Sequence, residues 1–396
     1  MDVIAFEDAA ATDFGPLAAM RHVAALRCGA FTMLERIDRV CGGRAILWGR
    51  PEQTEWTAEQ GGRAANDAVE GACRLLSAGV IWDREPELPP GSLGMIGKTV
   101  AAAHLPGETV SPEAALRGDW PNGPRVDVSD CGTPVRYPWD LVLRNGEQIA
   151  ADAVGLSAFS RGEAEERFPG AHFVGQAIHF EDAGTVSIGP GAVLDATDGP
   201  IVIGEHVRIK PNATIEGPCV IGEHSLVQHH AQIHDGVTIG PWCKVGGEVE
   251  ASILQGYSNK QHYGFLGHSY LGEWVNLGAG CTTSDLKNTY GPVSVPLHRA
   301  DEPIDTGSLF AGLVCGDYAK LGINTAVPTG ASIGVGSNVM GSRVPKHVPA
   351  MQWVVDGQMQ PFDADKAVVI AERMMARRQR TLGEAGRTLL TKTVKN

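Results

Sequence analysis

The sequence lacks several features that would each define a class of protein. Its eight cysteines include no CxxC pair, so neither a zinc ribbon nor a disulfide framework is indicated. No stretch approaches the roughly 20 uninterrupted apolar residues that cross a bilayer, and the opening MDVIAFEDAA has neither the basic start nor the apolar centre of a signal peptide. We therefore expect a cytoplasmic protein with reduced cysteines and no membrane partner.

Positive charge is in deficit. The 396 residues contain 33 Lys and Arg against 46 Asp and Glu, which gives a formal net charge of -13. Such a balance argues against nucleic acid as a partner, because phosphate backbones are bound by clustered basic residues. A phosphorylated small molecule would need a local basic site.

The sequence instead has a repeat of six residues. An Ile or Val recurs at every sixth position of one segment, namely Ile203, Ile209, Ile215, Ile221, Val227, Ile233, Ile239 and Val245. A second run with this spacing is Leu309, Cys315, Leu321, Val327, Ile333 and Val339, and a short run between them is Phe265, Leu271 and Leu277. A period of six fits neither a helix nor one long strand, but it fits stacked short strands joined by turns. We predict a left-handed parallel β-helix over residues 184–345, with glycine, Asn and Asp at its corners.

The segments around the repeat have other patterns. Residues 1–155 alternate short apolar runs with helix-like segments, which predicts a small α/β domain, and residues 156–183 are predicted to be a linker with a helix. Residues 283–308 are polar and keep no hexad register, so we expect a loop that leaves the solenoid and serves binding.

The tail, residues 346–396, contains an amphipathic helix with Asp363 as its N-cap. We expect its apolar face to cover the solenoid. Its basic residues are expected to be solvated, namely Arg373, Arg377, Arg378 and Arg380.

Several stretches, in order, resemble a known family. They are PLAAMRHVAALRCGAFTMLERI, YPWDLVLRNGEQIAAD, SNKQHYGFLGHSYLGEWVNLGA, DLKNTYG and KAVVIAERMMARR. They are similar to the short bacterial sugar nucleotidyltransferase family, which resembles the bifunctional N-acetylglucosamine-1-phosphate uridylyltransferase and glucosamine-1-phosphate N-acetyltransferase. The resemblance implies acetyl transfer from acetyl-CoA to an amino-sugar 1-phosphate in the β-helix. It also implies that residues 1–155 form a reduced α/β nucleotidyltransferase-like domain, which transfers a nucleotidyl group from UTP or another NTP to a sugar 1-phosphate with Mg2+. It also implies a homotrimer with clefts between subunits.

The resemblance also implies roles for residues of the solenoid. His262 falls on the base, since an imidazole that titrates near neutrality is suited to take the proton of an attacking amine. Asn276 falls beside the sugar and the acetyl group, and the backbone N–H of Ala279 falls where the thioester oxygen becomes an oxyanion. Lys260 is expected to offset substrate phosphate charge, and Asp285 stands at a substrate-binding position.

This chain departs from the bifunctional enzyme at several of these positions. Asp285 and Leu286 replace Asn-Tyr, Glu250 replaces a lysine for the sugar, Phe265 replaces a tyrosine, and Ile323 replaces a serine near the base. These departures bear on which sugar is accepted.

The first domain departs from the usual pattern as well. The strand Val3 to Phe6 is followed by EDAAATDFGPLAAMRH, which has one glycine instead of a glycine-rich loop that cradles a triphosphate. The resemblance implies other nucleotide and phosphate contacts, namely Arg21, Arg27, Arg144 and Asn145. Glu7 and Asp140 are candidate Mg2+ ligands.

Two alternatives remain open. Loss of the glycine loop and the altered sugar positions also suit a non-catalytic nucleotide-sugar sensor or scaffold. The solenoid histidines suit a γ-carbonic-anhydrase-like zinc enzyme, because neutral imidazoles and a water form catalytic zinc sites; the candidates are His206, His224, His229 and His234.

Overall fold

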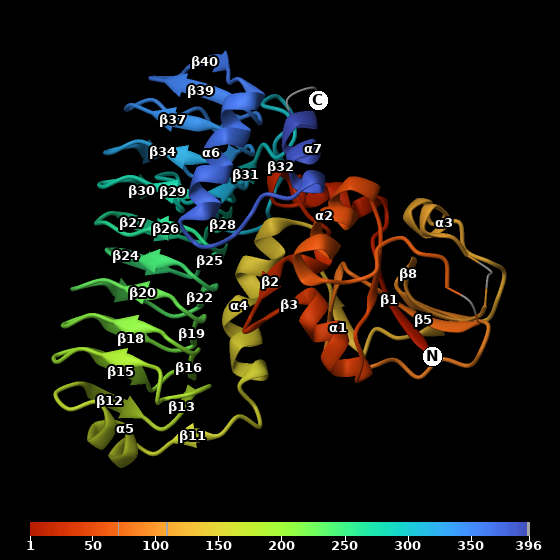
Figure 1. Cartoon of the computed structure of the whole chain (residues 1–396), viewed down its shortest axis with the longest axis horizontal. Helices are drawn as coiled ribbons and strands as arrows, with labels where there is room; N and C mark the ends of the chain where they lie inside the picture. The colour runs from red at the N-terminus through yellow and green to blue at the C-terminus, as the bar shows by residue number, and fades with distance from the viewer. Residues whose placement is uncertain (70, 108–109, 394–396) are drawn as a thin grey trace. The chain divides into compact units, whose positions relative to one another are not determined.

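The computed structural model describes residues 1–69, 71–107 and 110–393 and contains two compact units. The first unit comprises Met1–Leu26, Phe31–Tyr137 and Leu382–Lys392, and the second is built from Arg27–Ala30 and Pro138–Thr381. Figure 1 traces both from the red N-terminus to the blue C-terminus.

The first unit is an α/β domain around a six-stranded sheet (Figure 1). The strand order is β4 (Ile46–Trp48), β1 (Asp2–Phe6), β5 (Ala72–Ser77), β8 (Thr99–Pro106), β7 (Ser92–Ile96) and β9 (Arg125–Asp127). β1 pairs in parallel with β4 and β5, whereas β8 is antiparallel to β5 and β7. Val3 to Phe6 are buried on both faces, as expected for an interior strand of apolar residues.

The remaining elements of this unit connect and cover the sheet. They are the 3-10 helices η1 (Ala9–Leu17) and η2 (Val23–Ala25), helices α1 (Met33–Cys41), α2 (Pro51–Gly61), α3 (Pro112–Arg117) and α7 (Glu384–Lys392), and strands β3 (Phe31–Thr32), β6 (Val80–Trp82) and β10 (Gly132–Pro134). Helix α1 begins with a capping box, because Thr32 and Glu35 satisfy each other's backbone N–H groups.

The second unit is a left-handed parallel β-helix with three faces, which confirms the predicted fold class. The first face holds β11 (Ala158–Phe159), β13 (Ile178–Phe180), β16 (Ile201–Ile203), β19 (Cys219–Ile221), β22 (Val237–Ile239), β25 (Ile253–Gly256), β28 (Tyr270–Glu273), β33 (Val314–Cys315), β36 (Ser332–Ile333) and β38 (His347–Val348). The second face holds β12 (His172–Gly175), β15 (Val193–Ala196), β18 (Thr214–Glu216), β21 (Gln232–Ile233), β24 (Glu248–Glu250) and β27 (Phe265–Gly267), followed by the pair β30 (Thr282–Thr283) and β35 (Ala326–Val327).

The third face carries a cleft. Its strands are β14 (Ser187–Ile188), β17 (Arg208–Ile209), β20 (Leu226–Val227), β23 (Lys244–Val245), β26 (Asn259–Lys260), β29 (Asn276–Leu277), β34 (Lys320–Leu321), β37 (Asn338–Met340), β39 (Gln352–Val355) and β40 (Gln358–Pro361). Further elements of the unit are β2 (Arg27–Cys28), helices α4 (Pro138–Asp152), α5 (Arg161–Arg167) and α6 (Ala364–Ala376), and the hairpin β31 (Ser294–Val295) and β32 (Ile304–Asp305).

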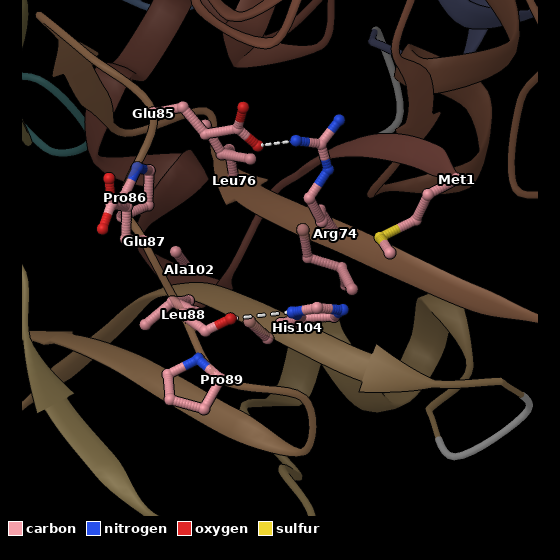
Figure 2. Close-up of a pocket in the computed structure, with 12 residues that line it drawn as sticks. Met1, Arg74, Leu76, Glu85, Pro86, Glu87, Leu88, Pro89, Ala102 and His104 are labelled. Atoms are coloured by element: carbon pink, nitrogen blue, oxygen red, sulfur yellow. Dashed lines mark hydrogen bonds and ion pairs between the residues drawn. The ribbon is translucent and has the colours of Figure 1, made fainter.

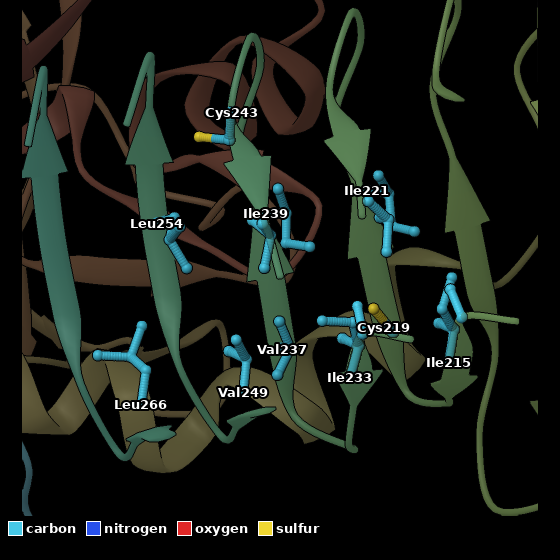
Figure 3. Packing of buried hydrophobic residues seen from close by; sticks show 14 of the residues in the cluster. Ile215, Cys219, Ile221, Ile233, Val237, Ile239, Cys243, Val249, Leu254 and Leu266 are labelled. Carbon is cyan, nitrogen blue, oxygen red and sulfur yellow. The ribbon is translucent and has the colours of Figure 1, made fainter. Parts of the chain in front are cut away.

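The hexad residues form the core of the solenoid (Figure 3). Successive hexad positions visit the three faces in turn, so that Ile203, Ile221, Ile239 and Leu254 stack on one another along the first face. All four are 0% exposed. The repeat therefore reports the interior ladder directly, because parallel pairing places every coil in register with the next.

Two positions of the predicted runs lie outside the ladder. Leu309 is 45% exposed, since the excursion that contains β31 and β32 extends beyond it, and the core resumes at Leu313. Phe265 lies on the outer side of its strand, and Leu266 takes the interior place. Coils shorter than eighteen residues follow Val245, which explains the slip in register.

Several corners hold the glycine or Asn that we expected, such as Asn212, Gly280 and Asn324, but others hold larger side chains. His224, Trp242, Tyr257, Trp274 and Tyr318 all have positive φ. Ring stacking offsets part of the cost of this backbone conformation, with ring centroids 4.3 Å apart for His224 and Trp242 and 4.4 Å apart for Tyr257 and Trp274.

Helix α6 begins as predicted, because the Asp363 side chain accepts a hydrogen bond from the Lys366 N–H at 2.9 Å. Its buried residues are Ala367, Ala371 and Met375. The hydroxyl of Tyr318, a corner residue of the solenoid, lies 3.4 Å from the Met375 sulfur, so this helix covers the third face.

We expect Leu254→Ala to destabilise the solenoid by about 2–5 kcal/mol, because it leaves a cavity between the ladder neighbours Ile239 and Leu271. The control Leu143→Ala removes a side chain that is 47% exposed on α4 and should change stability by less than about 0.5 kcal/mol. Urea unfolding followed by circular dichroism measures both. Equal losses would contradict the assignment of Leu254 to the ladder.

Candidate functional site

A cleft of about 490 Å³ lies on the third face of the solenoid. It is bounded by strands β23, β26, β29 and β34, by the corners that adjoin them and by the end of helix α6. The lining residues are Lys244, Tyr257, Asn259, Gln261, His262, Trp274, Asn276, Leu277, Gly278, Ala279, Lys320, Ile323, Met374, Arg377 and Arg378. Three residues predicted for the acyl-transfer site, His262, Asn276 and Ala279, are thus brought together.

His262 combines a fixed backbone with a free ring. Its carbonyl oxygen accepts a hydrogen bond from the Lys260 ammonium at 2.8 Å, and the carbonyl of the next residue, Tyr263, accepts one from the Gly280 N–H at 3.1 Å. The imidazole is exposed to the cleft and makes no hydrogen bond to the part of the chain that the structure describes. Both ring nitrogens are therefore available to a ligand.

Ala279 lines the same cleft, at a corner of the solenoid. Among the described residues no acceptor pairs with its backbone N–H, whereas the Ala279 carbonyl accepts from the Asn324 N–H at 2.7 Å. The next residue must be glycine, because Gly280 has φ 75 and a Cβ there would lie 2.2 Å from Asn324 Oδ1. An unpaired N–H on a rigid corner is suited to an oxyanion.

Asn276 lies between polar neighbours on the outer side of the third face. Its Oδ1 accepts a long hydrogen bond of 3.4 Å from Asn259 Nδ2, and Asn259 Oδ1 is buried and has no partner in the described part of the chain. The amide pair thus keeps unused hydrogen-bonding capacity in the cleft.

Lys260 does not lie where we expected it. It occupies an interior ladder position opposite Val245, is 1% exposed, and donates to the Gly246 and His262 carbonyls at 2.7 and 2.8 Å. Burial lowers its pKa to about 8. The prediction that Lys260 contacts substrate phosphate is wrong, because its ammonium group points into the coil and donates a hydrogen bond to the backbone carbonyl of His262.

Asp285 is also outside the cleft lining. Its carboxylate pairs with the His268 ring at 2.8 Å, and the ring stacks on Phe310 with centroids 4.8 Å apart. This contact ties the base of the 283–308 loop to the second face, and the substrate role of Asp285 stays a prediction. Of the other departures, Ile323 lines the cleft and is 70% exposed, whereas Glu250, Phe265 and Leu286 do not line it.

The cleft contains cations that the sequence reasoning did not assign to it. Arg377 and Arg378, expected to be solvated, line the cleft together with Lys244 and Lys320. Burial lowers the pKa of Lys320 to about 8. Burial and the nearby Arg378 and Arg377 lower the pKa of Lys244. The sequence contains a pattern that could have indicated this position of the lysines. Lys244 and Lys320 directly precede the interior residues Val245 and Leu321, just as Asn276 precedes Leu277, so all three occupy the same outward position of the repeat.

The four residues predicted for nucleotide binding are divided between the two units. Arg21 is buried in the first unit, where its carbonyl accepts from Arg50 at 3.0 Å. The other three, Arg27, Arg144 and Asn145, belong to the second unit. Arg144 is exposed on helix α4.

Asn145 and Arg27 serve the solenoid instead. Asn145 is 0% exposed, accepts from the Gly29 N–H at 2.8 Å and donates to the Gly236 carbonyl at 2.8 Å. The Arg27 N–H donates to the Tyr270 hydroxyl at 2.8 Å, and its guanidinium donates to the Ala30 carbonyl at 3.0 Å. These bonds anchor residues 27–30 to the β-helix, and the full burial of Asn145 corrects the phosphate role predicted for that residue.

Glu7 does not suit a metal ligand. Its Oε1 accepts from the Val23 N–H and from Arg50, and its Oε2 accepts two further bonds from Arg50, all at 2.7–3.0 Å. Burial alone would raise the pKa of Glu7, but His22 and Arg50 outweigh it and lower the pKa to about 2. Asp140 lies on α4 in the second unit. Within residues 1–69, 71–107 and 110–393 no cluster of His, Cys, Asp or Glu fits a metal ion.

The first unit has a larger pocket of about 890 Å³ beside strands β5 and β8 (Figure 2). Arg74 is paired with Glu85, and the His104 Nδ1 lies 2.8 Å from the Leu88 carbonyl oxygen. Glu87 adds a second carboxylate. The pocket therefore holds more acids than cations, which does not favour a triphosphate.

The solenoid histidines are arranged differently from a zinc site. The rings of His206 and His224 stack with centroids 4.5 Å apart. His234 lies between Glu216 and Glu248, and these carboxylates outweigh the effect of burial and raise its pKa. A histidine whose protonated form is favoured is a poor zinc ligand.

Comparison with known proteins agrees with this architecture. Residues 3–159 match the family model described as sugar nucleotidyl transferase, and residues 200–234 match the bacterial transferase hexapeptide model of six repeats. The two matches place the chain in the general class of transferases of nucleotide-sugar synthesis. No curated protein matches it. No helix among the described residues has the length and apolarity to cross a membrane.

A solved structure of an acyltransferase was also found. UDP-N-acetylglucosamine acyltransferase from Campylobacter jejuni is 15% identical, with 57% of this chain and 92% of the other covered, at a TM-score of 0.27. A likeness this loose carries no argument about the activity of this chain.

We expect Lys260→Met to change how stability depends on pH. Because the folded-state pKa of Lys260 is lowered from 10.5 to about 8, the folded chain binds fewer protons than the unfolded chain between these values. Stability of the wild type should therefore rise relative to the variant, by roughly 3 kcal/mol, as pH increases from about 8 to about 10.5.

Urea unfolding at several pH values measures this difference. Lys366→Met, which removes an exposed lysine from α6, is the matched control and should run parallel to the wild type. A constant offset between the wild type and Lys260→Met at every pH would contradict the prediction.

Proposed function

We propose that the β-helix catalyses acetyl-CoA-dependent N-acetylation of an amino-sugar 1-phosphate, with His262 as general base. The observation that carries the proposal is the cleft itself. It is lined by His262, whose imidazole makes no hydrogen bond to the described residues, and by Ala279, whose backbone N–H has no acceptor among them. The two neighbouring corners are joined by the hydrogen bond from the Gly280 N–H to the Tyr263 carbonyl. Asn276 completes the set. The resemblance stated above assigns the same three residues to acetyl transfer.

The proposed reaction uses the imidazole of His262 and the backbone N–H of Ala279. The amine nitrogen of the sugar attacks the thioester carbonyl carbon while His262 accepts a proton from that nitrogen. The Ala279 N–H donates a hydrogen bond to the oxygen as it gains negative charge. The C–S bond then breaks, and the proton passes from His262 to the departing thiolate, so that the products are the amide and free CoA.

For the first domain we propose nucleotidyl transfer from UTP or another NTP to a sugar 1-phosphate. The resemblance implies Mg2+ for this reaction, but the described residues offer no group of ligands that fits the ion. The match of residues 3–159 to sugar nucleotidyl transferases supports this proposal. The functional organisation that we propose is a catalytic domain of residues 1–155, a linker of 156–183, a solenoid of 184–345 and a tail of 346–396. The parallel strands of the solenoid extend beyond the proposed bounds, from β12 (His172–Gly175) to β39 (Gln352–Val355).

We expect His262→Gln to lower the rate of CoA release from acetyl-CoA about 10²- to 10⁴-fold, because the attacking amine loses its base. Pyrophosphate release with UTP should be unchanged, since the proposed nucleotidyl site lies in the other unit. Thiol and pyrophosphate assays with glucosamine 1-phosphate and N-acetylglucosamine 1-phosphate measure the two activities separately. His206→Gln removes an exposed corner histidine outside the cleft and is the control.

Two outcomes would reverse parts of this proposal. Loss of both activities in His262→Gln would mean that the activities are assigned to the wrong units. A wild-type protein that releases neither thiol nor pyrophosphate, yet binds nucleotide sugars in calorimetry, would establish the sensor alternative.

We further propose that the chain forms a homotrimer, which the match to hexapeptide repeats supports. Light scattering coupled to size exclusion should give three times the 41.9 kDa of one chain. A mass of one or two chains at micromolar concentration would contradict the trimer.

A further inference from the structure

A column of outward side chains on the third face carries no carboxylate. Strand pairing places in succession Arg208, Leu226, Lys244, Asn259, Asn276, Lys320 and Asn338. Apart from Leu226, each member is a cation or an amide. In a chain of net charge -13 this is a local reversal of sign.

The end of helix α6 adds two more cations to the lining of the cleft, Arg377 at its C-cap and Arg378 directly after it. Arg377 is exposed and Arg378 is half-buried, and in the described part of the chain neither guanidinium is paired with an acid. These cations repel one another: burial, Arg378 and Arg377 all lower the pKa of Lys244, and burial and Arg377 lower the pKa of Arg378. None of the lining residues is Asp or Glu.

The number of cations indicates the charge of the ligand. Four side chains that are cationic when protonated, Lys244, Lys320, Arg377 and Arg378, line one cleft. A phosphate monoester carries at most about two negative charges near neutral pH and would neutralise half of them. A ligand with two or more phosphate groups balances the whole set, and guanidinium groups bind phosphate oxygens in pairs.

The spacing along the face separates this charge from the acyl-transfer groups. Lys244 lies two rungs from Asn276 by way of Asn259, which at about 4.8 Å per rung is roughly 10 Å. An extended ligand can therefore place phosphates at one end of the cleft and a reacting group at the other.

We propose that Lys244, Arg377 and Arg378 form a subsite for the polyphosphorylated end of the acyl donor, whose thioester reaches His262. The inference rests on the proposed acetyl transfer and adds which substrate the cations of α6 recognise. The amino-sugar 1-phosphate, with one phosphate, is bound elsewhere. A nucleoside diphosphate sugar shares the diphosphate chemistry and is the competing source.

The test compares donors that differ in phosphate content. The variant is Arg377→Gln with Arg378→Gln, and the control is Arg373→Gln, an exposed arginine of α6 outside the cleft lining. Calorimetry measures the Kd of CoA, UDP-N-acetylglucosamine and glucosamine 1-phosphate, and steady-state kinetics measure KM for acetyl-CoA and for S-acetylpantetheine, which has no phosphate. Circular dichroism verifies that each variant is folded.

We expect the double variant to raise the Kd of CoA and the KM of acetyl-CoA at least tenfold, with the KM of the amino-sugar phosphate unchanged. The kinetics with S-acetylpantetheine should not respond, and neither should any measurement on Arg373→Gln. Lys244→Gln should act in the same direction as the double variant. Arg378→Lys should recover part of the CoA affinity, because the charge is retained.

Other outcomes overturn the proposal. Equal losses with S-acetylpantetheine, or a change in the sugar KM alone, would remove the donor subsite. Weakened binding of UDP-N-acetylglucosamine with unchanged CoA binding would assign the cations to a nucleotide sugar. If the wild type binds CoA through these arginines but releases no thiol, the subsite stands and the proposed acetyl transfer fails. If the wild type and the double variant release thiol with the same KM for acetyl-CoA, the acetyl transfer stands and the subsite fails.

Discussion

The stacking of aliphatic side chains inside three-sided coils is the constraint on which the second unit depends. Ile203, Ile221, Ile239 and Leu254 are wholly buried along one face, and the other two faces follow the same rule. Because strand residues alternate between inside and outside, each interior position fixes an outward neighbour one residue away. The cleft is built from these neighbours. Lys260 is the exception, since a charged side chain occupies an interior rung and its two carbonyl contacts immobilise the corner that carries His262.

Charge gives the cleft its chemical character. An acidic chain places Lys244, Lys320, Arg377 and Arg378 around one hollow without a carboxylate in its lining. Helix α6 is held on the third face by small buried residues and by the contact of Tyr318 with Met375. A helix that covers apolar surface therefore also supplies half of the local charge, and packing and recognition share one element.

The sequence predicted the solenoid and the cap of α6 at Asp363, because both depend on spacing along the chain or on a short motif. The grouping of His262, Asn276 and Ala279 was predicted by the resemblance to a known family, and the cleft brings the three residues together. The sequence did not predict that Lys260 points inward. The coil after Val245 is shorter than eighteen residues, and this shortening places Lys260 at an interior position that a lysine normally avoids. The sequence also did not reveal that the Asn145 amide is hydrogen-bonded to Gly29 and Gly236, which are distant in sequence. Nor did it reveal that the Glu7 carboxylate is hydrogen-bonded to Arg50 and Val23.

By itself the sequence determined the period of the fold and the identity of the groups available for chemistry, since both are local properties. Only the tertiary structure decided which of those groups face a common space. The unpaired N–H of Ala279, the buried ammonium of Lys260 and the meeting of Arg377 and Arg378 with Lys244 all arise from coils and a helix that are far apart along the chain. Long-range packing fixes burial and distance, and these two quantities set whether a charge is neutralised, saturated or left available for a ligand.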